Sequence, residues 1–252
     1  MKLNELKNLF ISYTENYLRG ESEHDFNIKL KKNHSLLVAD FCRYIAASEN
    51  LSEKKADLSY SAGLLHDIGR FEQFKNYNTF HDAASVDHGD LGSQILCDSE
   101  FAEYFSSVEM RDLLFTVKYH NKKEFPHSDD LATLLTLIVR DADKLDIYRV
   151  ITEMFNSDTA GLISHHLPDT HEYSMDIIED ILKGNQICYT RRKTRNDMKL
   201  TMLNWVQDLS FRYSFQHVKE KNYVEIICST LPDTSDILEV KRYISEYIEK
   251  KS

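Results

Sequence analysis

Apolar residues recur every three or four positions along most of this chain, which is the spacing of one face of an α-helix. The alternation of apolar and polar residues that is typical of strands is scarce. Residues 223–228 (Tyr-Val-Glu-Ile-Ile-Cys) also fit a short strand. The pattern predicts an all-α fold, with helices near residues 3–19, 26–50, 53–68, 88–97, 99–106, 109–122, 128–156, 172–183, 195–220 and 235–251.

The composition agrees with this fold class. With only 7 Gly and 3 Pro in 252 residues, a loop-rich β fold is not expected. A chain of this length fits one domain and can bury roughly 70 to 75% of its surface. We therefore expect a single all-α domain over residues 1–252.

The net charge and the cysteine spacing limit which partners and which cellular environment are expected. A formal net charge of −10 argues against a nucleic acid polymer as partner, because such binding needs many Lys and Arg contacts to phosphates. The densest basic cluster, residues 191–195, fits a solvated loop. No secretory segment opens the chain, and its longest apolar run, residues 134–139, is too short for a membrane span. We expect a cytoplasmic protein without membrane contact, with free thiols at Cys42, Cys97, Cys188 and Cys228.

Four histidines lie on the inward-facing sides of separate predicted helices. Helical steps forward from His34 reach Leu37 and Val38, and steps back from His120 reach Val117. A lone histidine on an apolar face is more often a core residue than a ligand. Several histidines beside buried carboxylates change that interpretation, because a buried carboxylate needs a cation or a full set of donors. A divalent metal ion satisfies this need for the set formed by His34, His66, His88 and His120 with Asp67 and Asp143.

The adjacent pair His66-Asp67 needs its own explanation. Consecutive helical residues point about 100° apart, so the two side chains cannot easily serve one ion from the middle of a helix. Gly69 is a plausible helix stop, and at a fraying last turn both side chains could reach one site. The carboxylate could also bridge two ions. Gly63, one turn before His66, would let another helix or an ion approach closely.

Five separated segments occur in an order that resembles one known family. Residues 63–71 read Gly-Leu-Leu-His-Asp-Ile-Gly-Arg-Phe, after a helical His34 and before Arg-Asp-Ala-Asp-Lys-Leu-Asp at residues 140–146. Between them lie Val-Asp-His-Gly-Asp-Leu-Gly-Ser-Gln-Ile-Leu at residues 86–96 and Val-Lys-Tyr-His-Asn-Lys-Lys at residues 117–123. Together these segments resemble the HD superfamily of metal-dependent phosphohydrolases, and the segment with the second-metal histidine resembles its dinuclear branch.

The resemblance implies a fold and a metal centre. The expected fold is an HD-domain helical bundle at about residues 26–150, with additional C-terminal helices at about residues 151–252. Imidazole and carboxylate ligands suit Mn, Fe, Co, Ni or Zn better than Mg, so we expect one or two divalent transition-metal ions. The implied ligands are His34, His66, Asp67, His88, His120 and Asp143.

The implied reaction is hydrolysis of a small phosphorylated substrate, a nucleotide or another phosphate ester, by metal-activated water. Asp67 could take the proton from that water. Arg70 lies just after the His66-Asp67 pair, Lys144 directly follows Asp143, and both could hold the phosphate. The sequence leaves the oligomeric state open, a homo-oligomer included.

Two assignments depend on the resemblance rather than on spacing. Periodicity does not choose among Asp141, Asp143 and Asp146, which lie in one helical run, and the family pattern selects Asp143. A second His-Asp pair, at His81-Asp82, lies outside the motif segments and is assigned no role.

Other members of the same superfamily supply the competing functions. A cyclic-di-GMP phosphodiesterase is not expected, because the Gly-Tyr-Pro signature is absent from residues 121–126, and a bifunctional alarmone enzyme would need a synthetase-like second domain. A mixed-valent di-iron oxygenase uses a similar ligand set. A non-catalytic nucleotide-binding protein could keep the metal site for stability. Both remain alternatives to the phosphohydrolase.

Overall fold

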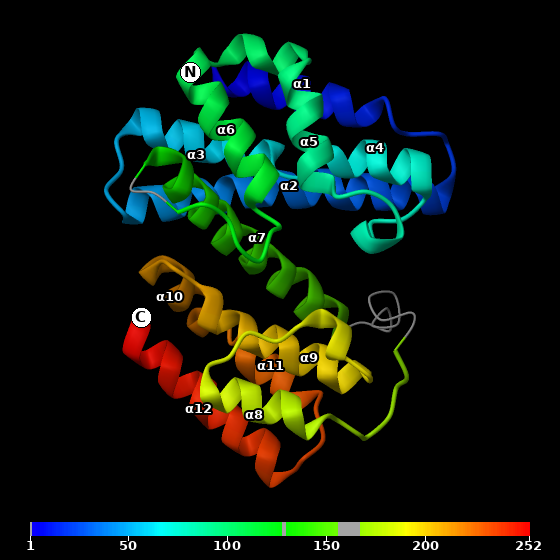
Figure 1. Ribbon diagram of the computed structural model, residues 1–252, viewed down its shortest axis with the longest axis vertical. Coiled ribbons are helices and arrows are strands. Elements are labelled where there is room, and N and C mark those ends of the chain that lie inside the picture. The colour runs from blue at the N-terminus through cyan, green and yellow to red at the C-terminus, as the bar shows by residue number, and fades with distance from the viewer. Residues whose placement is uncertain (1, 128–129, 156–166) are drawn as a thin grey trace. The chain divides into compact units, whose positions relative to one another are not determined.

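The computed structural model describes residues 2–127, 130–155 and 167–252 (Figure 1). These residues form helices and contain no strand, so the predicted all-α class is confirmed. The chain separates into two compact units, Met1–Asp143 and Lys144–Ser252. The single domain expected over residues 1–252 stays a prediction. In the described part of the chain, no helix has the length and apolar character needed to cross a membrane.

The first unit contains every predicted metal ligand. Its helices pack as neighbours, with α2 against α3, α4 against α5 and α5 against α6 (Figure 1). A cluster of buried apolar residues, including Phe10, Leu64 and Phe71, lies between them. The elements are α1 (Leu3–Glu15), α2 (Ser22–Ser48), α3 (Glu53–Leu65), α4 (Ile68–Tyr77), η1 (Asp82–Ala84), α5 (His88–Cys97), η2 (Glu100–Tyr104), α6 (Ser107–Tyr119) and α7 (Leu131–Phe155), which runs on into the second unit.

Gly63 allows α3 to approach α2 closely. A Cβ atom at this position would lie 2.7 Å from Cys42 Sγ and 2.9 Å from the Ala39 Cα atom. The close approach that the small residue allows is therefore made by a helix. It brings the end of α3, where His66 follows, next to the middle of α2, which carries His34.

The sequence suggested Gly69 as a helix stop, but the structure places this residue inside a helix. The break comes earlier, at Asp67, whose backbone angles (φ −100°, ψ 16°) lie outside the helical region, and Gly69 is the second residue of α4. A Cβ atom on Gly69 would lie 2.2 Å from the His88 carbonyl oxygen and 2.7 Å from the Gly92 backbone nitrogen. The glycine is needed because α4 and α5 touch here. The prediction missed α4 because it treated this glycine as the end of a helix.

Three other predicted elements need correction. Residues 99–106 form only the short 3-10 helix η2. The helix predicted at 195–220 is broken, because Leu209 and Phe211 have extended backbone and bury their side chains. Residues 223–228 are helical rather than a strand. Tyr223, Val224, Ile227 and Cys228 are buried at a spacing that places them on one helix face.

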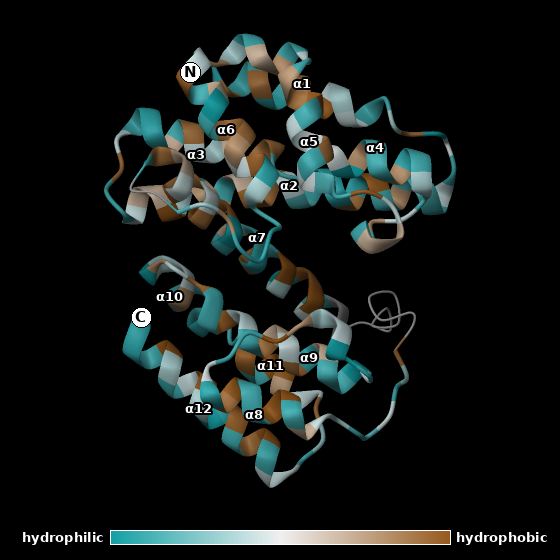
Figure 2. Ribbon diagram, viewed as in Figure 1, coloured by the Kyte–Doolittle hydropathy of each residue, from teal (hydrophilic) through white to brown (hydrophobic). Residues whose placement is uncertain are grey.

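The second unit packs short amphipathic helices around its own core. Its elements after α7 are α8 (Met175–Lys183), η4 (Tyr189–Arg191), α9 (Arg195–Asn204), η5 (Trp205–Asp208), α10 (Arg212–Glu220), α11 (Tyr223–Ser229) and α12 (Ser235–Lys251). Figure 2 shows apolar and polar residues on the same helices, as in α8, which buries Ile177, Ile178 and Ile181. Of the helix predicted at 128–156, residues 128–129 and 156 lie outside the described residues.

Candidate metal centre

Four histidine side chains gather in the interior of the first unit. His34 comes from the middle of α2, His66 follows the last residue of α3, His88 begins α5 and His120 follows α6. Their exposed fractions are 5%, 0%, 3% and 5%, respectively. Neighbouring rings lie in contact, with centroid separations of 5.3 Å (His34–His66), 5.1 Å (His66–His120) and 5.0 Å (His88–His120). The structure thus brings together the histidines that the sequence singled out.

Two groups of side chains in this cluster could each hold a metal ion. His34, His66 and Asp143 form one, and His66, Asp67 and His120 form the other, with the ligand atoms of each group within 4.8 Å of one another. His34 Nε2 lies 3.0 Å from Asp143 Oδ1, and His66 Nε2 lies 3.9 Å from the same oxygen. Both groups contain His66, so the two positions adjoin.

The two oxygens of Asp67 face different pairs of imidazoles. Oδ2 lies 3.7 Å from His34 Nε2 and 3.6 Å from His66 Nε2. Oδ1 lies 3.3 Å from His88 Nε2 and 3.9 Å from His120 Nε2. Because each oxygen faces its own pair, this carboxylate has the geometry of a bridge between two adjoining ion positions.

The hydrogen bonds of the two Nδ1 atoms determine the tautomers of His66 and His120. His66 Nδ1 donates to the Gly63 carbonyl oxygen at 2.7 Å, and His120 Nδ1 donates to the Val117 carbonyl oxygen at 2.8 Å. A carbonyl can only accept, so Nδ1 carries the hydrogen in both rings. Burial lowers the pKa of both imidazoles, and for His120 the neighbouring imidazoles of His88 and His66 lower it further. Each neutral ring then presents a lone pair on Nε2, the form that binds metals.

Two features of the Nε2 atoms fit a cation. His66 Nε2 is buried and has no hydrogen-bond partner among the described residues, a state that costs about 1 to 3 kcal/mol. His88 Nε2 and His120 Nε2 face each other at 3.1 Å. With Nδ1 of both rings engaged by oxygens, two lone pairs meet there, and a positive charge removes the repulsion. The donor set therefore fits a divalent metal ion.

The pKa values of both carboxylates of the cluster are lowered. Burial alone would raise the pKa of the Asp67 carboxyl, but the charges of Lys31 and Arg70 help to hold it well below its usual range. Burial acts in the same direction on Asp143, and there the hydrogen bond and charge of His34 outweigh it, so that this pKa is lowered too. Anionic ligands are thus in place without any change of protonation.

Comparison with known proteins identifies a domain within the chain. A family model described as the HD domain matches residues 32–148. The chain carries an HD domain. HD domains belong to a superfamily of metal-dependent phosphohydrolases, and every predicted ligand lies within the matched segment. No curated protein and no solved structure matches the chain.

Lys31 is a charged residue of this centre that the sequence prediction missed. It lies one residue before the matched HD segment, and its Nζ donates to Asp67 Oδ2 at 2.8 Å. The side chain is 21% exposed. Its position could have been found from spacing, because residues three apart share a helix face and Lys31 precedes His34 by three.

The two cations proposed for phosphate binding are both engaged in ion pairs. Arg70 Nε lies 3.3 Å from Asp67 Oδ1, and its Nη1 donates to Asp82 Oδ1 at 2.7 Å. Lys144 Nζ lies 2.8 Å from Asp208 Oδ2, within the second unit. The substrate roles of Arg70 and Lys144 stay predictions.

The three aspartates of α7 have different surroundings. Asp143 reaches His34, whereas Asp146 is fully buried and pairs with Arg149 at 2.8 Å. Asp141 is also fully buried; burial raises the pKa of the Cys42 thiol, and the charges of Asp143 and Asp141 raise it further. Periodicity could not separate them because α7 buries side chains on more than one face.

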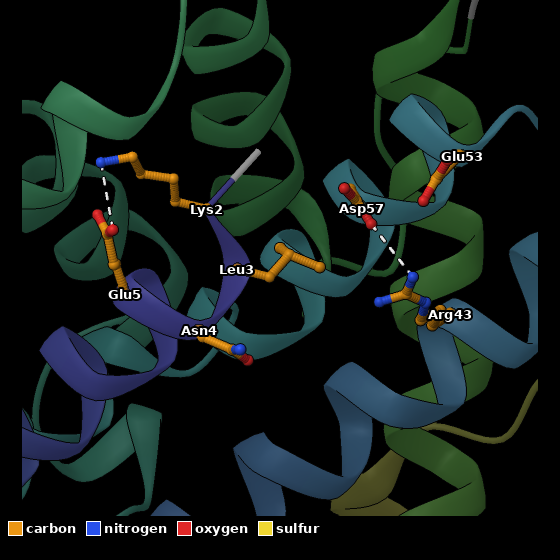
Figure 3. Close-up of a pocket in the computed structure, with 7 residues that line it drawn as sticks. All are labelled: Lys2, Leu3, Asn4, Glu5, Arg43, Glu53 and Asp57. Atoms are coloured by element: carbon orange, nitrogen blue, oxygen red, sulfur yellow. Dashed lines mark ion pairs between the residues drawn. The ribbon is translucent and has the colours of Figure 1, made fainter.

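A separate cavity of about 430 Å³ in the first unit is lined by Lys2, Leu3, Asn4, Glu5, Arg43, Glu53 and Asp57 (Figure 3). None of the predicted site residues lines it. Lys2 pairs with Glu5 at 3.2 Å and Arg43 pairs with Asp57 at 3.5 Å, so charged groups of its wall neutralise one another. We assign this cavity no function.

Proposed function

We propose that this HD-domain protein is a metal-dependent phosphohydrolase that acts on a nucleotide or another small phosphate ester. The observation that carries the proposal is the convergence of imidazole Nε2 atoms on the ionised Asp67 in a buried site. We assign one ion to His34, His66 and Asp143, and a second to His88 and His120, with Asp67 as the ligand they share. Mn, Fe, Co, Ni and Zn suit these donors.

In this proposal the bound ion and the protein side chains have different roles. A divalent ion would supply a water with a pKa of about 7 and would polarise a phosphoryl oxygen. We assign the Asp67 carboxylate the role of shared ligand rather than proton acceptor, because its pKa is held well below the usual range. Lys31 supplies positive charge beside that carboxylate, where it would meet a phosphate oxygen.

The charge distribution favours a small substrate over a polymer. In the basic cluster at 191–195, Arg191 pairs with Asp176 at 2.6 Å and also with Asp180, and Arg195 pairs with Asp169 at 2.8 Å. Two of its cations are thus neutralised by neighbouring acids. Together with the net charge of −10, this supports a small phosphorylated molecule as the partner.

The experiment that tests this function is phosphate release from a panel of nucleotides and phosphate esters, with the metal-free protein reconstituted with Mn, Co, Ni, Fe or Zn. We expect release that depends on the added ion and is absent without it. A protein that binds these ions but releases no phosphate from any member of the panel would contradict the proposal. Two iron ions per chain with oxygen-dependent turnover would favour the di-iron oxygenase instead.

Replacing Lys31 with Met tests the proposed phosphate contact. We expect the substrate KM to rise by about 10-fold or more, because a hydrogen bond to a charged group contributes about 1.5 to 3 kcal/mol. Metal affinity should stay equal or increase, since a competing cation leaves Asp67. The measurements are steady-state kinetics and metal titration. Lys32→Met, at the next position of α2, is the matched control, and an unchanged KM in Lys31→Met would remove Lys31 from the substrate site.

A further inference from the structure

Asp82 lies in η1, between α4 and α5, and joins two parts of the site. Its Oδ2 lies 2.6 Å from His88 Nδ1. Its Oδ1 accepts hydrogen bonds from Arg70 Nη1 at 2.7 Å and from Gln73 Nε2 at 2.9 Å. Each oxygen of this carboxylate therefore has its own set of partners. From the sequence alone the pair His81-Asp82 is assigned no role, but Asp82 contacts a predicted ligand.

The contact with His88 determines which ring nitrogen is available. An ionised carboxylate can only accept, so His88 Nδ1 carries the hydrogen and Nε2 presents a lone pair. That Nε2 atom lies 3.3 Å from Asp67 Oδ1 and 3.1 Å from His120 Nε2. Histidines that bind metals commonly donate their other N–H to a carboxylate, which orients the ring and strengthens it as a ligand.

Asp82 is itself held in place from α4. Gln73 is fully buried and donates to Ser85 Oγ and to the Val86 carbonyl oxygen, each at 2.9 Å, in addition to Asp82. Arg70 Nη1 also donates to the Phe80 carbonyl oxygen at 2.5 Å. The loop around η1 is thus tied to the helix that begins directly after Asp67, and this fixes the direction of the Asp82 carboxylate.

We infer that Asp82 is a positioning residue for the ion held at His88, where it keeps the imidazole in the tautomer whose Nε2 can ligate. The inference rests on the proposed metal centre, because it concerns one of its two ion positions. It also gives Arg70 a place in the site, as a donor that orients Asp82 while contacting Asp67.

The inference distinguishes the effect of Asn from that of Ala at position 82. An asparagine has one oxygen, and Arg70 together with Gln73 would draw it toward the position of Oδ1. Its NH₂ group would then face His88 Nδ1, which would have to accept and leave the hydrogen on Nε2. Asp82→Asn has the same shape as the native residue, yet it favours the tautomer that cannot bind metal. Asp82→Ala leaves Nδ1 open to water, so the Asn variant should be impaired at least as much as the Ala variant.

The test is titration of metal-free protein with Co²⁺, followed by the absorption spectrum of the bound ion and by the stoichiometry. We expect the wild type to bind two ions. In Asp82→Asn, the affinity for one of them should fall by about 10- to 100-fold, with a changed spectrum for that ion. His88→Ala should lose the same ion, and Asp82→Asn should have no further effect in the His88→Ala background. Asp90→Asn, which removes a charge from the first turn of α5, should bind as the wild type does.

Three results would overturn the inference. If Asp82→Asn binds Co²⁺ with wild-type affinity, the shape of the side chain is sufficient, whatever the result for Asp82→Ala. An undiminished effect of Asp82→Asn in the His88→Ala background would show that Asp82 does not act through His88. A wild-type protein that binds no ion would overturn both this inference and the proposed function, whereas the first two results leave the proposed function standing.

Discussion

Asp67→Ala is expected to abolish metal retention and phosphohydrolase activity. Asp67 faces all four imidazoles with its two oxygens, so its removal takes a ligand from both ion positions. It also leaves Lys31 and Arg70 with an unbalanced positive charge beside the imidazoles, which opposes cation binding. The affinity should fall by more than about 100-fold, because residues that merely orient a ligand already contribute about 10- to 100-fold.

Elemental analysis and phosphate release measure this effect together. Asp98→Ala is the control. It makes the same chemical change outside the cluster, at an aspartate that is exposed at the end of α5. Asp67→Asn separates charge from shape and should also lose its ions. Retention of the full metal content by Asp67→Ala would exclude Asp67 from the ligands.

Gly69→Ala is expected to cause the largest loss of stability among single-methyl additions near the site. The added Cβ would meet two backbone atoms, the His88 carbonyl oxygen at 2.2 Å and the Gly92 nitrogen at 2.7 Å, and neither can move away without shifting α5. Overpacking of a core costs about 1 to 3 kcal/mol when side chains can adjust, so a clash between backbones should cost at least about 3 kcal/mol. Since His88 begins α5, ion affinity at His88 should fall as well.

Chemical denaturation of the Gly69→Ala variant measures this loss, with Gly20→Ala as the matched control. A Cβ on Gly20 would meet no atom within 4 Å, and its φ of +79° adds only a conformational penalty of about 1 to 2 kcal/mol. Equal losses in the two variants would show that α4 and α5 separate easily and that the close contact does not hold His88.

The convergence of the histidines could be predicted because it depends on local periodicity. His34 lies on an apolar face of α2 and His120 directly follows α6 in step with its apolar face, and such faces turn inward in any compact all-α fold. The choice of Asp143 over Asp141 could not be made in this way, because both lie in a helix that is buried on more than one side, and it required the resemblance to HD proteins.

The features that the sequence analysis missed depend on contacts between distant segments. Gly69 signals a helix stop by its local preference, but its contact with α5 made glycine necessary inside a helix. Asp82 reaches His88 only because the loop between α4 and α5 folds back on Gln73, and no periodicity describes such a loop. Residues 223–228 have the composition of a strand, and burial of one helical face decided the outcome.

The metal content of the purified wild-type protein tests the central claim most directly. We expect one or two divalent transition-metal ions per chain, retained through gel filtration and reduced in the His66→Ala variant, which removes a ligand of the ion assigned to His34, His66 and Asp143. The predicted result would establish the buried cluster as a metal centre. A wild-type protein that holds no ion after incubation with Mn, Fe, Co, Ni or Zn would contradict the account and leave a buried polar cluster in its place.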